Sequence, residues 1–149
     1  MKEELELVIR LVIAFVLGIV FGLEREKRHK PAGLRTHVLV ALGAALFTLA
    51  GIYGFRVPSI DGMIRNNDPT RVAAQIVTGV GFIGGGIIFK DRDNIRGITT
   101  AASIWLTAGL GMGIASGLYL LTGVAALLGL LGLEMDHLMN RSHSNEKQE

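Results

Sequence analysis

Long runs without a charged residue alternate with short charged segments along the chain. These runs cover residues 11–23, 38–55, 72–89 and 97–133. A helix needs about 20 mostly apolar residues to cross the roughly 30 Å hydrocarbon core of a bilayer, so the first three runs each predict one membrane helix. At about 1.5 Å per residue, the last run is nearly twice too long for one helix. We therefore predict that it folds back on itself.

The pattern predicts an all-α integral membrane protein, a five-transmembrane-helix bundle. The long last run is expected to turn at Gly113–Gly117 (GIASG). The first run extends back to Leu5, because Glu6 and Arg10 share one helix face, where they can pair while Arg10 snorkels outward. The predicted helices lie near residues 5–23, 36–55, 71–89, 98–115 and 118–138.

One domain accounts for nearly the whole chain. Residues 1–140 form the predicted transmembrane domain, and residues 141–149 form a short polar tail. The longest polar stretch between helices, Arg56–Thr70, is bounded by Pro58 and Pro69 and is expected to be a loop or an interfacial helix. No stretch is left for a separate soluble domain.

The charged flanks predict the orientation. A cleavable signal peptide carries basic residues before its apolar stretch, whereas here acidic residues precede the first run and GLEREKRHK follows it. Ten basic residues fall in the segments after the first and third helices and in the tail, against four on the other side. The positive-inside rule then places the N-terminus outside and the C-terminus in the cytoplasm, as expected for a multi-pass protein of the bacterial or archaeal inner membrane.

Composition narrows the function classes further. Half of the residues are apolar and 19% are charged, and the net charge of +2 is too small to suggest a nucleic-acid partner. The chain has no cysteine, so a thiolate nucleophile and a Cys-type zinc site are excluded. The four histidines are scattered, His37 is expected at the interface, and no nucleophile and base are paired. We expect neither an enzyme nor a bound cofactor.

The 20 glycines fit a membrane bundle, where small residues let helices approach closely. Pairs four residues apart, which predict packing seams, are Gly18 and Gly22, Gly81 and Gly85, Gly109 and Gly113, and Gly113 and Gly117. The GxGxxG order of Gly79, Gly81 and Gly84 is not a dinucleotide fingerprint, because it lies inside an apolar run. An alternative is a third helix kinked or broken at membrane depth, as in transporters.

Two predicted cytoplasmic loops resemble each other and hold candidate functional residues. Each contains an acidic-Arg-acidic triplet, Glu24-Arg25-Glu26 and Asp91-Arg92-Asp93, and each ends with an Arg and a Thr at a helix start. The pattern is consistent with a parallel internal repeat. One interpretation is helix capping by Thr and contact of Arg with lipid phosphate. The other is a vestibule in which Glu24, Asp91 and Arg35 or Arg96 form a network or meet a ligand.

The motifs GxERE, KPAGLRTH and RGITTAASIW together resemble those of the MgtC/SapB family of membrane proteins, over roughly residues 8–138. The resemblance implies a five-helix inner-membrane bundle. It also implies a link to growth in low magnesium, to survival in hosts (virulence) and to restraint of the membrane ATP synthase. By position, the family pattern falls on Glu24, Arg25, Gly33, Arg35, Thr36, Gln75, Gly79, Gly81, Arg96, Gly97, Thr100 and Trp105.

The chain departs from the family pattern in two ways. Many relatives continue into a soluble C-terminal domain, and some have Asn where this chain has Thr99. A regulatory role housed in that domain, or one dependent on the amide, need not transfer.

Two hypotheses from different classes remain. The chain is either a regulatory protein that packs its small-residue face against another membrane protein, or a small ion transporter or channel with a path along the Gly-rich third helix. All acidic residues lie at predicted helix ends or in loops, whereas a path for divalent ions is expected to carry membrane carboxylates. No metal ligand set is defined, and homo-oligomerisation is expected. The candidate functional residues are Glu24, Arg25, Arg35, Thr36, Gln75, Gly79, Gly81, Asp91, Arg96, Thr99, Thr100 and Trp105.

Overall fold

Helices dominate the structure, as the sequence predicts. The computed structural model describes residues 1–54, 57–58, 64–65, 68–91 and 94–145. Within these residues the five helices are α1 (Lys2–Lys27), α2 (Leu34–Leu49), α3 (Pro69–Ile87), α4 (Ile98–Ala115) and α5 (Tyr119–Asn145). A π-helical turn, η1 (Ala50–Gly54), continues α2. The expected all-α class is confirmed.

Two short hairpins occupy segments for which the sequence predicted a loop or, in the case of Arg56–Thr70, a loop or an interfacial helix. Strand β1 (Val57–Pro58) pairs antiparallel with β2 (Ile64–Arg65), and β3 (Phe89–Asp91) pairs antiparallel with β4 (Asn94–Arg96). The rest of the predicted Arg56–Thr70 loop falls largely on residues 55–56, 59–63 and 66–67, outside the described part, as do Arg92 and Asp93. Pro69 opens α3 at a position where its missing N–H costs nothing.

The helix ends differ from the predicted ones by a few residues. Helix α1 extends over the charged residues at both ends, because Glu3 and Glu4 in its first turn and Arg25 and Lys27 in its last turn suit the helix macrodipole. The long uncharged run does fold back, with α4 ending at Ala115 and Gly117 in the turn at φ 80°. Helix α5 runs to Asn145, so the expected polar tail begins as helix.

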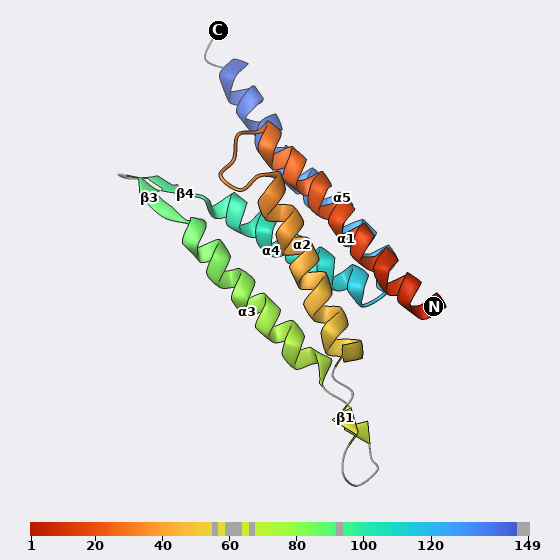
Figure 1. Cartoon of the computed structure of the whole chain (residues 1–149). Coiled ribbons are helices and arrows are strands. Elements are labelled where there is room, and N and C mark those ends of the chain that lie inside the picture. The colour runs from red at the N-terminus through yellow and green to blue at the C-terminus, as the bar shows by residue number, and fades with distance from the viewer. Residues whose placement is uncertain (55–56, 59–63, 66–67, 92–93, 146–149) are drawn as a thin grey trace.

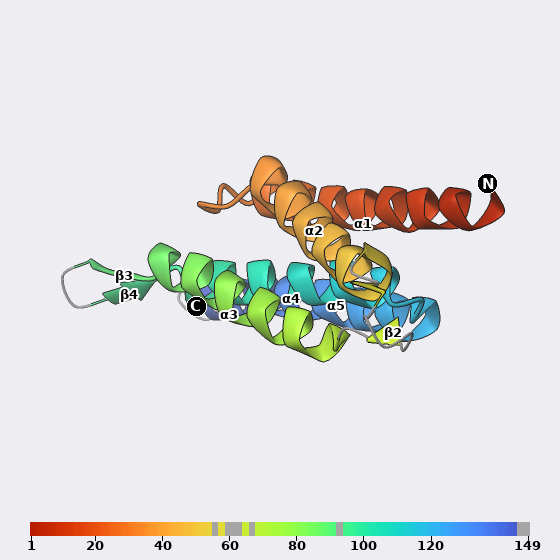
Figure 2. The same ribbon diagram turned by 60° about the horizontal axis from the view of Figure 1, so that its bottom comes forward.

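Helix α4 is the centre of the bundle, since it contacts each of the other four helices. Helices α1 and α2 form one layer over α3, α4 and α5 (Figure 2). Successive helices run in opposite directions, so the two chain termini lie at opposite ends of the bundle (Figure 1). The β3–β4 hairpin lies at the end that holds the C-terminus, and the β1–β2 hairpin lies at the other end.

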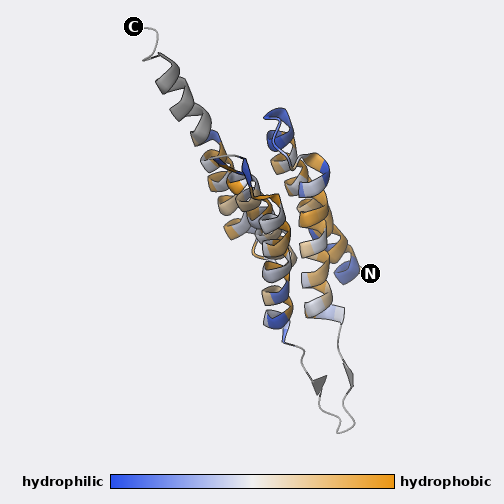
Figure 3. Ribbon diagram, turned by 90° about the vertical axis from the view of Figure 1, so that its left-hand side faces the viewer, coloured by the Kyte–Doolittle hydropathy of each residue, from blue (hydrophilic) through white to orange (hydrophobic). Residues whose placement is uncertain are grey.

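Hydrophobic residues cover the middle of the helices, and hydrophilic residues gather near their ends (Figure 3). Three helical segments are long and apolar enough to cross a membrane by length and composition, namely Lys2–Lys27, Leu34–Gly54 and Ile98–Ala115. The apolar part of α5, Tyr119–Met135, is shorter. A membrane location is therefore supported by the described residues.

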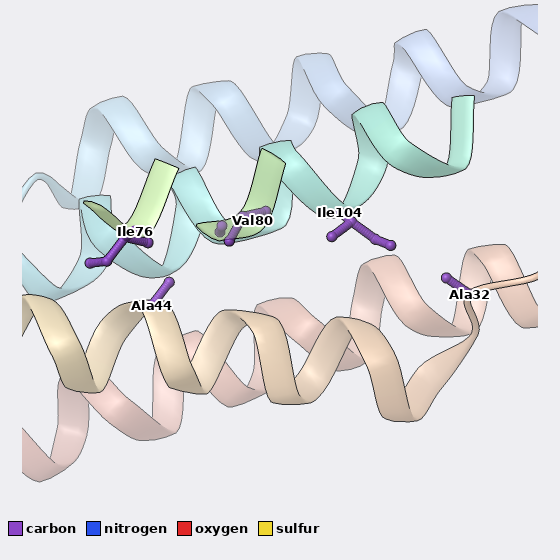
Figure 4. Close-up of a cluster of buried hydrophobic side chains, with 6 residues drawn as sticks. Ala32, Ala44, Ile76, Val80 and Ile104 are labelled. Atoms are coloured by element: carbon purple, nitrogen blue, oxygen red, sulfur yellow. The ribbon is translucent and has the colours of Figure 1, made fainter. Parts of the chain in front are cut away.

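Small side chains bring the two layers together. Ala32, in the loop before α2, and Ala44 of α2 face Ile76, Val80 and Ile104 of α3 and α4 in a buried cluster (Figure 4). Helices α1 and α2 approach each other even more closely than the two layers do. A Cβ atom added at Gly18 would lie 2.7 Å from Cα of Val38, and one added at Gly22 would lie 2.6 Å from Cα of Leu34. The predicted seam at Gly18 and Gly22 is thus a backbone-to-backbone contact between helices.

The glycines of α3 are different. The helix is continuous from Pro69 to Ile87, so the alternative of a third helix broken at its glycines is wrong. Gly84 faces Ala101 of α4, whereas a Cβ added at Gly79, Gly81, Gly85 or Gly86 would meet no atom within 4 Å. The predicted seam at Gly81 and Gly85 therefore has no partner among the described residues.

Arg10 joins the first and fourth helices. It pairs with Glu6 at 2.5 Å, as predicted, but it does not simply snorkel outward. Its Nη1 donates to the carbonyl oxygen of Ala115 at 2.7 Å, and its guanidinium lies 5.9 Å from the ring centre of Tyr119. A cation at the C-terminal end of α4 satisfies a carbonyl that the helix itself leaves unpaired.

Candidate functional site

A buried guanidinium lies near the C-terminal end of α1. Arg25 is only 1% exposed, and its Nε and Nη2 both donate to the carboxylate of Glu24, with 2.7 Å between Nη2 and Oε1. The remaining nitrogen, Nη1, is buried without a hydrogen-bond partner in the described part of the chain. Because burying an uncompensated charge is costly, the stability of this arrangement depends on Glu24.

The same carboxylate begins a chain of ion pairs that reaches α5. Nε of Arg28 lies 2.5 Å from Oε1 of Glu24, and Nη2 of Arg28 lies 2.6 Å from Oε2 of Glu134. The hydrogen bond that Arg28 donates to the Glu134 carboxylate, together with the Glu24 carboxylate, raises the pKa of the Arg28 guanidinium above its ordinary value. Arg28 therefore stays charged and connects the end of α1 to α5.

A second buried polar group joins α2 to α4. His37 has no exposed surface; its Nδ1 lies 3.0 Å from the carbonyl oxygen of Gly33, and its Nε2 lies 3.1 Å from Oγ of Ser103. Since a carbonyl only accepts, Nδ1 carries the proton, and the single proton of the Ser103 hydroxyl is available either to Nε2 or to a second acceptor. That hydroxyl also lies 2.8 Å from the carbonyl oxygen of Thr100. His37, which was expected at the membrane interface, is thus enclosed within the protein by the close α1–α2 contact.

The start of α2 is capped, but not by threonine. Gly33 is the N-cap residue and provides no side-chain cap, Arg35 is exposed and Thr36 is half-buried. Instead, the carboxylate of Glu26 accepts a hydrogen bond from the backbone N–H of Leu34 at 3.0 Å. The predicted Thr capping is wrong here, because an acidic side chain from the end of α1 reaches the free amide first.

The start of α4 also lacks a threonine cap. Thr99 is exposed and Thr100 is 2% exposed, and the N-cap residue is Gly97 with φ 92°. A Cβ added at Gly97 would collide with the carbonyl oxygen of Ile87. Glycine is required because the left-handed backbone turns the chain from β4 into α4 beside the end of α3.

Gly97→Ala is therefore expected to destabilise the protein. The left-handed conformation alone costs a residue with a Cβ about 1–2 kcal/mol, and the collision with Ile87 adds to this. Thermal unfolding in detergent, followed by circular dichroism, measures the effect. Gly86→Ala is the matched control, since its Cβ enters open space at the end of α3, close to the same hairpin. Equal melting temperatures for the two variants would contradict the prediction.

Asp91, the described residue of the second acidic-Arg-acidic segment, does not join the first segment. Asp91 and Arg96 pair with each other at 3.3 Å across the β3–β4 hairpin, and their side chains are 49% and 63% exposed. No ion pair connects them to Glu24 or Arg25 within the residues described. The two loops that resemble each other in sequence are thus a helix end in one case and an exposed hairpin in the other.

The remaining candidates lie on the surface of the helices. Gln75 and Gly79 line a cavity between α2 and α3, and Gly81 is exposed on another side of α3. Trp105 is 53% exposed and borders a smaller cavity of about 160 Å³ between α3 and α4. A metal centre is not indicated, because the described residues contain no group of three or more His, Cys, Asp or Glu that could hold an ion.

Five residues that make the polar contacts described above were not among the predicted functional residues. They are Glu26, Arg28, His37, Ser103 and Glu134. The spacing of Glu24 and Arg28, four residues apart on a helix, was a usable signal for one pair. The ion pair between Arg28 and Glu134 joins residues that are far apart in the sequence, so no local sequence pattern predicts it.

Comparisons with known proteins agree on one family. The family model described as MgtC family matches residues 11–142. YhiD of Escherichia coli (strain K12), named "Putative magnesium transporter YhiD", is 49% identical over 144 residues, which are 93% of this chain and 66% of that protein. Protein MgtC of Brucella abortus (strain 2308) is 46% identical over 114 residues, 76% of this chain and 44% of that protein.

A third relative is similar to this chain over most of its length. Protein SapB of Bacillus subtilis (strain 168) is 39% identical over 131 residues, which are 87% of this chain and 56% of that protein. The chain thus spans between about two fifths and two thirds of the length of these relatives. No solved structure matches the chain.

Proposed function

Because the chain belongs to the MgtC family, we propose that it is a five-span inner-membrane protein that acts in magnesium homeostasis by binding another membrane protein. The name of YhiD supports the magnesium link. The membrane ATP synthase is the first partner to test, since the family resemblance implies restraint of that enzyme. This regulatory role is preferred to transport for the reasons that follow.

The proposed topology has five crossings, with the N-terminus outside and the C-terminus in the cytoplasm. The alternating direction of the five helices and the opposite positions of the termini support it. The positive-inside rule supports the orientation, because the basic segment after α1 and the β3–β4 hairpin lie at the same end of the bundle.

The observation that carries the proposed interaction is the α3 small-residue face (Ala74, Thr78, Gly81 and Gly85). These residues recur at helical spacing, and all four are exposed. The hydroxyl of Thr78 donates to the carbonyl oxygen of Ala74 at 2.9 Å, so the face has little unmet polarity. Glycine costs a helix about 1 kcal/mol relative to alanine, and close approach of a second helix compensates for this cost.

Transport is less well supported by the polar groups inside the bundle. The hydroxyls of Thr48 and Thr107 donate to backbone carbonyls of their own helices, at 2.7 Å and 2.8 Å. The carboxylate nearest the interior, Glu24, is held by two arginines. A path for a divalent cation needs oxygen ligands that are free to replace water, and these groups are already engaged.

Flux and co-purification assays separate the two functions. We expect sealed vesicles containing the protein to take up no more Mg²⁺ than protein-free vesicles. We expect chemical cross-linking in native membranes to link the chain to ATP synthase subunits, and Gly81→Leu to reduce the yield about tenfold, as loss of roughly 1.4 kcal/mol of binding would.

Gly123→Leu is the matched control, because Gly123 lies on α5 and its Cβ would also enter open space. Mg²⁺ uptake that disappears with Gln75→Leu would instead establish a transporter. Cross-links only between copies of the chain would identify homo-oligomerisation as the role of the α3 small-residue face.

A further inference from the structure

An apolar groove runs between α2 and α3 and is open to the surface. Its volume is about 650 Å³, within the range of about 300–1,000 Å³ typical of ligand pockets. Along α2 it extends from Leu39 to Ala50, and along α3 from Val72 to Ile83. Gln75 is its most polar lining residue. The groove is defined here as the α2–α3 groove.

The length of the α2–α3 groove matches one leaflet of a bilayer. Eleven helical steps separate its two ends on each helix, which is about 16 Å at 1.5 Å per residue. The hydrocarbon of one leaflet is about 15 Å deep, half of the roughly 30 Å core. The groove begins at Val72, the residue after the charged Arg71, so it starts where the membrane interface is expected.

Two glycines leave space in the middle of the groove. Gly43 and Gly79 lie on opposite walls, and no atom lies within 4 Å of a Cβ added at either one. These glycines keep the groove open along its middle.

Hydrogen-bond donors lie at the interfacial end. Arg71 is exposed and stands four residues before Gln75, so both project from the same side of α3. The carboxylate of the neighbouring Asp68 accepts two hydrogen bonds from Thr70, one from its backbone N–H at 3.0 Å and one from its side-chain hydroxyl at 2.5 Å. These two bonds lower the pKa of Asp68. No ion pair between Asp68 and Arg71 occurs in the described structure.

We propose that the α2–α3 groove binds one phospholipid, whose acyl chain lies between the two helices and whose phosphate is bonded by Arg71 and Gln75. A guanidinium donates strongly to phosphate oxygens, and the N-terminal end of α3 adds a positive field at the same place. Apolar walls of one-leaflet length and a cation at the interfacial end together match this amphipathic ligand.

This site is separate from the proposed partner surface. Val72, Ile76 and Gly79 face the groove, whereas Gly81 and Gly85 lie on the opposite side of α3 by helical spacing. Substitutions at Gly43 or Gly79 and substitutions at Gly81 therefore separate lipid binding from partner binding.

Native mass spectrometry of the full chain in detergent, with added phosphatidylglycerol, tests the proposal. We expect one lipid to remain bound to each chain. A Cβ at Gly43 or Gly79 meets no atom within 4 Å, so a leucine there projects into the groove, and we expect Gly43→Leu and Gly79→Leu each to lower the bound fraction about tenfold. Gly123→Leu is the matched control and should retain the lipid.

The phosphate contact is tested separately from the acyl chain. We expect Arg71→Gln to weaken lipid retention about five- to tenfold, as loss of a charge-assisted hydrogen bond would. Lys90→Gln removes a charge beyond the other end of α3 and should leave retention unchanged. We expect the unsubstituted protein to retain diacylglycerol with the same acyl chains as weakly as the Arg71→Gln variant retains the phospholipid. Inorganic phosphate alone should not compete with the phospholipid.

Three results would overturn the proposal. The first is a folded native chain that retains no lipid. The second is lipid retention that is unchanged in both Gly43→Leu and Gly79→Leu. The third is a dimer that dissociates in Gly79→Leu without any change in bound lipid, which would mean that a second copy covers the groove.

Discussion

Glu24→Gln is expected to destabilise the protein by about 3–5 kcal/mol, the cost of leaving a buried charge without its partner. Arg25 is 1% exposed, and Glu24 is the carboxylate that receives both its Nε and its Nη2. The substitution also removes one of the two carboxylates that hold Arg28. Equilibrium unfolding in mixed micelles, followed by circular dichroism, measures the loss.

Two comparison variants identify the cause. The double variant Glu24→Gln/Arg25→Met should be more stable than Glu24→Gln alone, because it removes the uncompensated charge and keeps the core filled. Glu134→Gln should cost at most about 1 kcal/mol, since Glu134 is 52% exposed and water screens its pair with Arg28. If Glu24→Gln costs no more than Glu134→Gln, the Arg25 charge does not depend on Glu24.

Gly22→Ala is expected to produce the second large effect. The added Cβ would lie 2.6 Å from Cα of Leu34, and backbone cannot rotate away as a side chain can. Overpacking of this kind costs about 1–3 kcal/mol, and here α1 must also separate from α2, which opens the enclosure around His37. The measurement is the change in unfolding free energy in the same micelles.

Gly123→Ala is the matched control for Gly22→Ala. Its Cβ meets no atom within 4 Å, so it should gain up to about 1 kcal/mol from the higher helix propensity of alanine. Opposite signs for the two substitutions would confirm that the α1–α2 contact sets the requirement for glycine. A Gly22→Ala variant as stable as Gly123→Ala would show that the two helices can separate at little cost.

The two charged segments after the first and third helices show how much a sequence pattern can predict. The two acidic-Arg-acidic segments suggested one shared vestibule, but Glu24 and Arg25 lie in a helix and bind each other, whereas Asp91 and Arg96 pair across an exposed hairpin. Similar local sequences form different structures here, because the first segment is packed against α2 and α5 and the second projects from the bundle (Figure 1).

The sequence by itself determined the helical class, the approximate helix positions and the fold-back at Gly117, because hydrocarbon thickness and local charge act on neighbouring residues. Only the tertiary structure decided which glycines are packed, which carboxylate holds which arginine, and that His37 is buried. These features depend on contacts between residues far apart in the chain, such as His37 with Ser103 and Arg28 with Glu134, and helix spacing alone does not specify them.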